Sequence, residues 1–170
     1  MYETDGDFER VQQLLDRSVE RASAFLRSSF EMPEHSLSAC QLTEHLHGSL
    51  TVALATVTAR GEPRVAPINA VFVGGRFHVP TVAEAARARH LGRRPAASLT
   101  YYEGIDVAVI AHGAVQIIGV EDPEFTAIDA AQVESGRESP RDWGGHAVYL
   151  RLEPETLYTY ARHLERIGAA

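Results

Sequence analysis

Residues 50–73 read LTVALATVTARGEPRVAPINAVFV and predict two strands joined by a tight turn. From Leu50 to Thr58, large apolar side chains alternate with small ones, which is the period of a β-strand. Residues 59–62 have turn chemistry, and an apolar run returns from Arg64 to Val73. The stretch therefore predicts a β-hairpin. Because the returning run is apolar on both of its faces, we expect a partner subunit or a ligand to cover the face that the core leaves free.

The rest of the chain predicts further short strands, separated by turns and by a few helices. Strands are expected at residues 76–79, 97–102, 105–120, 147–152 and 156–160, with Gly113 marking a bulge in the longest. Helices are expected at Phe8–Phe30, after a capping box at Ser38 and Gln41, at Ala83–Leu91, and from Asp122-Pro123 to about Ser135. Asp5 or Asp7 is expected to cap the first helix and Asp122 the last. Short strands joined by hairpins favour an antiparallel barrel over a βαβ sheet.

Composition narrows the class of protein. The chain has 170 residues, 45% of them hydrophobic, which is enough for one core. Cys40 is its only cysteine, so no intramolecular disulfide can form, and we expect this side chain to be buried. No apolar run suits a membrane span and the acidic start lacks a signal-peptide core, so a cytoplasmic protein without membrane contact is expected. The net charge of −7 argues against a nucleic-acid partner.

A candidate anion site lies where a strand end meets a helix start, at residues 81–87. The first N–H groups of a helix attract anions, Thr81 adds a hydroxyl donor, and Arg87 can form charge-assisted bonds to phosphate oxygens. Arg64 on the neighbouring hairpin is positioned to close the other side. The chain contains no lysine, so arginine must supply every such cation. A solvated basic helix face is the alternative interpretation of these residues.

Several linked segments together resemble the pyridoxamine 5′-phosphate oxidase-like family. They are Gly61-Glu62-Pro63-Arg64-Val65-Ala66-Pro67, Gly74-Gly75, Phe77-His78-Val79-Pro80-Thr81, a helix with Arg87 six residues after Thr81, and Arg93-Arg94-Pro95-Ala96-Ala97-Ser98-Leu99. The resemblance covers about Leu42 to Val120, with a weaker echo to Tyr160. It implies a split β-barrel that binds FMN, or the deazaflavin F420, at the interface of a homodimer.

With this resemblance, the predicted fold is mainly β (α+β): an antiparallel split β-barrel with flanking helices and an N-terminal helical extension. We place the extension at residues 1–48 and the FMN-binding split-barrel domain at residues 49–170.

The resemblance also assigns a cofactor site. The family's phosphate-binding Thr…Ser-x-Lys falls on Thr81, Ala85 and Arg87, where arginine keeps the charge and alanine loses a hydroxyl. The family's first FMN-contacting strand falls on residues 64–69. The predicted cofactor-binding residues are therefore Arg64, Val65, Ala66, Pro67, Ile68, Asn69, Thr81, Ala85, Ala86 and Arg87.

Other features of the family are missing or ambiguous. Gln116 is one candidate for the glutamine that true oxidases place near the flavin. The C-terminal Trp…Arg-Leu-Ala-Pro ending of those oxidases is absent, so the vitamin B6 reaction is not expected. The residues identify no catalytic acid or base.

The remaining polar and aromatic residues give weaker signals. The eight histidines show no ligand spacing, so no metal site is predicted, although His78 and His112 on strands could approach a cofactor. No nucleophile motif for acyl transfer occurs. Residues 101–103 and Trp143 are candidates for lining a substrate pocket, or else for closing the rim of the barrel.

These observations predict an FMN-binding, homodimeric oxidoreductase that transfers hydride or electrons between the flavin and a small organic substrate. One alternative is an F420-dependent reductase, because Arg89, Arg93 and Arg94 suit a longer anionic tail. The other is a non-catalytic flavin- or haem-binding stress-associated protein.

Overall fold

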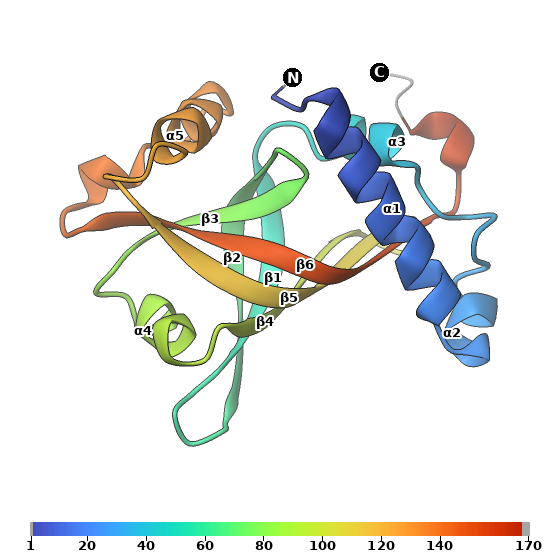
Figure 1. Ribbon diagram of the computed structural model, residues 1–170, viewed down its shortest axis with the longest axis horizontal. Helices are drawn as coiled ribbons and strands as arrows, with labels where there is room; N and C mark the ends of the chain where they lie inside the picture. Colours follow the sequence, from blue (N-terminus) through green and yellow to red (C-terminus); the bar gives the residue numbers. More distant parts are fainter. Residues whose placement is uncertain (1, 168–170) are drawn as a thin grey trace.

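The computed structural model describes residues 2–167, which form a closed antiparallel barrel with the strand order β1-β2-β3-β6-β5-β4 (Figure 1). This architecture confirms the predicted mainly β fold with flanking helices. The strands are β1 Leu50–Val57, β2 Pro63–Val73, β3 Arg76–Val82, β4 Ala96–Glu103, β5 Val107–Gly119 and β6 Ala147–Ala161.

The predicted hairpin is present as β1 and β2, but its tip leaves the barrel. Gly61 takes φ +84° in the turn, and the backbone N–H of Thr58 donates to the carbonyl of Glu62 at 3.0 Å. β1 pairs with β4 only over residues 53–55, and β2 pairs with β3 only over residues 71–73. The rest of the hairpin therefore projects as a two-stranded ribbon, seen at the bottom of Figure 1.

The projection leaves the first half of the returning strand without cover from its own chain, so the expected cover by a partner subunit or a ligand stays a prediction. Only the end of β2, residues 70–73, is buried, whereas residues 63–67 are exposed and the exposed fraction of Val65 is 71%. An apolar pattern reports which residues can be buried, but the register with neighbouring strands decides which residues have cover. Within this chain, the first half of β2 has none.

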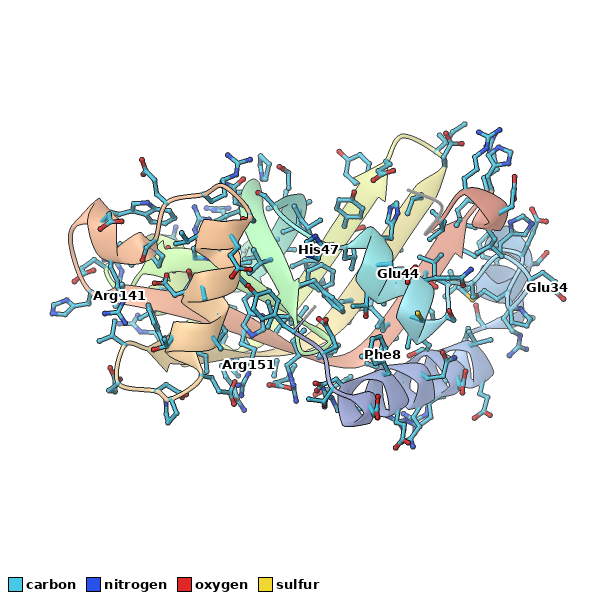
Figure 2. The ribbon with its side chains drawn as sticks, turned by 90° about the horizontal axis from the view of Figure 1, so that it is seen from above. Phe8, Glu34, Glu44, His47, Arg141 and Arg151 are labelled. Atoms are coloured by element: carbon cyan, nitrogen blue, oxygen red, sulfur yellow. The ribbon has the colours of Figure 1, made fainter. Side chains whose placement is uncertain are left out.

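Helices from the N-terminal segment pack on one side of the barrel. They are α1 Asp5–Arg21, α2 Ala24–Ser29 and α3 Ala39–His45. Val11, Leu14 and Leu15 of α1 belong to the same buried cluster as the inner residues of the barrel. Figure 2 shows Phe8 on α1, while Arg141 lies at the other end of the molecule, beside α5. The boundary between residues 48 and 49 stays a prediction.

The single helix expected from Phe8 to Phe30 is wrong, because it is broken into two. Ala22 is extended at ψ 141°, and the Ser23 hydroxyl accepts from the backbone N–H of Leu26 to start α2. The cap of α1 is Thr4, whose hydroxyl accepts from Asp7 N–H while the Asp7 carboxylate bonds back to Thr4. Asp7 therefore completes a capping box at the third helical position instead of capping the helix itself.

Helix α5, Phe125–Glu134, covers the outer face of the barrel on the opposite side. Phe125, Ile128 and Ala131 form a second buried cluster with the outward-facing Val71 of β2 and Tyr149 of β6, whereas Ala70 and Phe72 of β2 belong to the barrel core. Asp122 was expected to cap the helix, but the N-cap is Glu124, two residues later. The Asp122 carboxylate instead accepts from the backbone N–H of Glu124 at 2.9 Å and orders the preceding turn.

The bulge predicted at Gly113 is confirmed, and it explains a second correction. The register between β5 and β6 shifts at His112/Gly113, where a Cβ on Gly113 would lie 2.0 Å from the carbonyl oxygen of Glu153. The shift accommodates Pro154, which lacks an N–H donor. As a result, residues 147–161 form one continuous strand instead of the two that were expected.

Two further observations concern the surface. Cys40 is exposed on α3, so the expectation of a buried thiol is wrong; it occupies a face of the short helix that the barrel does not cover.

None of the helices among residues 2–167 has both the length and the apolar character needed to cross a membrane.

Acid stability of this fold should depend on His78 of β3. His78 is 2% exposed and lies in register between Val71 and Arg151. Burial, reinforced by the positive charge of Arg151, lowers the pKa of His78 from 6.5 to about 3. Between these two values the unfolded chain binds a proton that the folded chain does not, so the free energy of unfolding falls as the pH drops through this window.

Below pH 6.5, the free energy of unfolding should fall less steeply with decreasing pH when His78 is replaced by glutamine. The slope should be smaller by up to about 1.4 kcal/mol per pH unit. Urea unfolding at a series of pH values measures this slope. The variant His47→Gln, at an exposed position after α3, is the matched control. An acid limb that is equally steep in His78→Gln and in the wild type would contradict the assignment.

Candidate functional site

Helix α4, Ala86–Arg93, lies beside the projecting hairpin (Figure 1). It begins three residues later than expected, because Ala85 is its N-cap and residues 83–85 form a turn after β3. Ala88 and Leu91 bury the inner side of α4 against the barrel. Arg94, at its end, donates from Nη2 to the carbonyl oxygen of Ala59 in the hairpin turn at 2.9 Å. The helix and the hairpin therefore hold one another in place.

A cavity of about 300 Å³ opens between the hairpin and α4. It brings together residues from the two segments in which the sequence predicted a cofactor site. Arg64 is opposite Thr56 and Ala66 is opposite Leu54 in the β1–β2 register, so the Arg64 and Ala66 side chains share the face of the ribbon that continues the barrel interior. The lining residues are Leu54, Thr56, Arg64, Val65, Ala66, Ala86, Arg87 and His90.

The other five predicted site residues are not among the residues that line this cavity. Ile68 packs against the barrel core, and Pro67 and Asn69 lie on the opposite face of β2. Thr81 is 5% exposed and follows Phe77 and Val79 in the alternation that faces the core. Ala85 caps α4 with no side-chain hydrogen bond. The role of all ten residues in cofactor binding stays a prediction.

A wider groove of about 440 Å³ continues from the cavity along the hairpin turn and α4. Arg64 and His90 line both spaces, so the two are contiguous. Its lining residues are Thr58, Ala59, Arg60, Glu62, Arg64, Arg89, His90 and Arg93. We refer to these residues as the basic groove, because four of them are arginines and only one is a carboxylate. In a chain with a net charge of −7, such a local excess of cations favours anionic ligands.

Sequence reasoning identified Arg89 and Arg93 as extra cations but missed Arg60 and His90. A helical signal for His90 was present, since Arg87 and His90 are three residues apart and therefore share one face of α4. Arg60 gave no such signal. Its position in the groove depends on how the hairpin turn packs against α4, which is a tertiary contact.

The turn that leads into α4 is anchored to the loop before β6. The Glu84 carboxylate accepts from the backbone N–H of His146 at 3.2 Å and contacts its Nδ1 at 2.5 Å. These bonds lower the pKa of Glu84 and raise that of His146. Gly145, at φ +89°, leaves room for the carboxylate, because a Cβ there would be 2.8 Å from Glu84 Oε2. The start of α4 is thereby fixed from outside the cavity.

The other side chains that the sequence singled out lie away from the cavity. Gln116 is bonded to Arg151 near the start of α5, and Figure 2 shows Arg151 in that region. His78 is buried, and His112 Nδ1 lies 2.8 Å from the Ser98 hydroxyl. Trp143 is partly exposed in the short turn of 3₁₀ helix before β6. Among residues 2–167 no group of three or more His, Cys, Asp or Glu side chains is placed to hold a metal ion.

Comparison with known proteins places this architecture in a family. The model of the family described as pyridoxamine 5′-phosphate oxidase matches residues 40–161, which is more than half of the chain. Among curated protein sequences, none matches the chain.

Solved structures share the fold at low sequence identity. A conserved hypothetical protein from Mycobacterium tuberculosis has a TM-score of 0.67 at 18% identity, covering 81% of this chain and 93% of that one. An F420 reductase has a TM-score of 0.54 at 18% identity, with coverage of 66% and 92%. A haem-storage protein from Vibrio cholerae has a TM-score of 0.55 at 15% identity, with coverage of 71% and 92%. These likenesses show a common fold.

Proposed function

Because the chain belongs to the pyridoxamine 5′-phosphate oxidase-like family of flavin-binding split barrels, we propose that it is a flavin-dependent oxidoreductase with FMN as its cofactor. The cavity between the hairpin and α4 binds the cofactor in this proposal. FMN supplies hydride or electron transfer to or from a small organic substrate. The protein supplies anchoring of the phosphate and orientation of the ring.

The observation that carries the proposal is that two arginines from different elements line the same cavity together with apolar residues. Arg64 comes from β2 and Arg87 from α4, and both line the cavity of about 300 Å³. Leu54, Val65 and Ala86 provide apolar surface in the same cavity. A flavin mononucleotide has these two requirements, an anionic end and a large apolar ring.

The donors present suit a phosphate. The first N–H groups of α4 have no partners within the helix, as at any helix start, and no side chain caps them at Ala85. Together with Arg87 on the first turn they favour an anion there. Because Ala85 provides no hydroxyl, the arginines bear most of the phosphate anchoring.

In this proposal a partner subunit adds a further wall to the cavity. Its volume lies at the lower end of the range for small-molecule sites, and one of its walls is the exposed ribbon. The outer face of the sheet carries a continuous row of residues in register, contributed by five strands: Pro67, Ala53, Thr100, Ile110 and Tyr158. Val65 is exposed on the same face, and three of the five residues in the row (Pro67, Ala53 and Ile110) are also apolar, so this face carries apolar surface of the kind that soluble proteins cover. We therefore include a homodimer in the proposal, with this outer face as its interface.

The proposed substrate belongs to the broad class of small organic molecules. No residue is assigned as a catalytic acid or base.

One observation favours a second candidate, an F420-dependent reductase. The basic groove is contiguous with the cavity, and Arg89 and Arg93 extend it away from Arg87. F420 has a longer anionic tail than FMN, and this groove would suit such a tail. A non-catalytic flavin- or haem-binding protein is the third reading.

Removal of Arg87 tests the proposed phosphate anchor. Arg87→Ala deletes one or two charge-assisted hydrogen bonds, each worth about 1.5–3 kcal/mol, so the Kd for FMN should rise at least about tenfold. Quenching of flavin fluorescence measures this Kd. Riboflavin, which has the ring without the phosphate, should bind both proteins equally, and Arg17→Ala on α1 serves as the matched control. Equal FMN affinity in wild type and Arg87→Ala would show that the phosphate does not bind there.

Titration with FMN and F420 separates the candidate functions. We expect FMN to bind the apoprotein, F420 to compete with it, and the double variant Arg89→Ala/Arg93→Ala to leave the FMN affinity unchanged, because FMN has no tail to reach these residues. If F420 binds, FMN does not, and the double variant weakens F420 binding, the function moves to deazaflavin chemistry. A folded dimer that binds neither cofactor would favour the non-catalytic reading.

Light scattering at micromolar concentration tests the proposed dimer. The wild type should have the mass of two chains, and Ile110→Glu should yield monomers with weaker FMN binding, because it places a charge in the outer apolar row. Ile105→Glu, the same change at an exposed position in the β4–β5 turn, should remain dimeric. A monomeric wild type that still binds FMN tightly would contradict the shared site.

A further inference from the structure

The only carboxylate that lines the basic groove is bonded to two of the groove's own arginines. Glu62 Oε2 accepts from Arg64 Nη2 at 3.0 Å, and Glu62 Oε1 lies 3.3 Å from Arg60 Nη2. The Glu62 carboxylate thus pairs with the same arginines to which an anionic ligand of the groove would bind.

The hairpin turn fixes Glu62 in this position. Its backbone N–H donates to the Thr58 hydroxyl at 3.2 Å, and its carbonyl oxygen accepts from the Thr58 N–H at 3.0 Å. The Glu62 side chain is 39% exposed, compared with 59% for Arg64 and 82% for Arg60. The carboxylate is therefore the most restrained and least exposed of the three charged groups.

Arg64 connects this pairing to the proposed cofactor site, because it lines both the groove and the cavity. A phosphate that binds the Arg64 guanidinium must either displace the Glu62 carboxylate from it or bind beside that carboxylate. Both routes cost binding free energy, since like charges close together repel and the existing pair must be loosened.

We propose that Glu62 is a specificity-determining residue that competes with phosphate-bearing ligands for Arg64. It lowers the affinity of the site for phosphate without affecting its affinity for the uncharged ring of a ligand. This inference rests on the proposed function in placing a phosphate beside Arg64, and it goes beyond that function in assigning Glu62 a role opposed to binding.

The size of the effect follows from the exposure of the groups. Exposed ion pairs are worth little individually, so removal of the Glu62 charge should tighten phosphate binding about fivefold, equivalent to about 1 kcal/mol at 1.4 kcal/mol per tenfold. The gain should shrink as salt is added, because the Debye length falls to about 8 Å at physiological ionic strength.

The test compares the wild type, Glu62→Gln and Glu9→Gln. Glu9 lies on α1, so Glu9→Gln makes the same change in net charge away from the groove. Three probes are titrated: FMN, riboflavin, and pyrophosphate, which reports on the anion site without any ring. Glu62→Gln should increase the affinity for FMN and for pyrophosphate about fivefold and leave the affinity for riboflavin unchanged, whereas Glu9→Gln should change none of the three affinities.

A double-variant cycle identifies the cation involved. In the background Arg64→Gln, the substitution Glu62→Gln should give a much smaller gain for pyrophosphate, because the contested guanidinium is gone. A gain that persists in full would show that Glu62 acts through general charge and would overturn the proposal.

The remaining outcomes separate this inference from the proposed function. If Glu62→Gln tightens pyrophosphate while no variant binds a flavin, the role of Glu62 stands and the flavin function fails. If the wild type binds FMN and Glu62→Gln binds FMN and pyrophosphate no more tightly than Glu9→Gln, the flavin function stands and the role of Glu62 is refuted. Equal tightening of riboflavin, or the absence of pyrophosphate binding in both Glu62→Gln and the wild type, would also refute it.

Discussion

The closing register of the barrel determines where the candidate site can form. β1 bonds to β4 over only three residues, Ala53 to Ala55, and β2 bonds to β3 over only three, Val71 to Val73. Both limits leave the tip of the hairpin without a neighbouring strand. The ribbon that results is long enough to stand beside α4, where the contact between Arg94 and the Ala59 carbonyl fixes it. A longer β1–β4 pairing would draw the ribbon into the sheet and remove the cavity.

Charge then gives this cavity its chemical character. The chain is acidic overall, yet the hairpin turn and α4 together present arginines around one contiguous space. The two elements are separate in sequence: α4 is basic by itself, with Arg87, Arg89 and Arg93 and no carboxylate, and the hairpin adds Arg60 and Arg64. Glu62 is the exception within this surface, and its pairing with Arg60 and Arg64 leaves the site less cationic than its arginines alone would make it. Affinity for an anion is therefore set by the balance between the two signs of charge.

Local chemistry predicted much of the fold. The hairpin turn at Gly61, the capping box at Ser38 and Gln41, and the bulge at Gly113 depend on a few neighbouring residues, and all three are present. The helix break at Ala22 was missed because apolar residues continue at helical spacing across it. The continuity of β6 through Pro154 was missed for a different reason. It depends on the register with β5, which a single-sequence pattern does not contain.

The residues of the candidate site were likewise predicted only in part. Sequence order and the family resemblance indicated Arg64 and Arg87, and the structure brings both into one cavity, whereas Thr81 lies among the residues that face the core. Arg60 and His90 were not predicted, because their part in the groove arises only when the hairpin packs on α4.

A crystal structure of the protein grown with FMN is the most direct test of this account. We expect that structure to show the FMN phosphate within hydrogen-bond distance of both Arg64 and Arg87, beside the first turn of α4. A phosphate bound elsewhere, for example in the cavity of about 340 Å³ that Tyr2, His47 and Glu134 help to line, would contradict it.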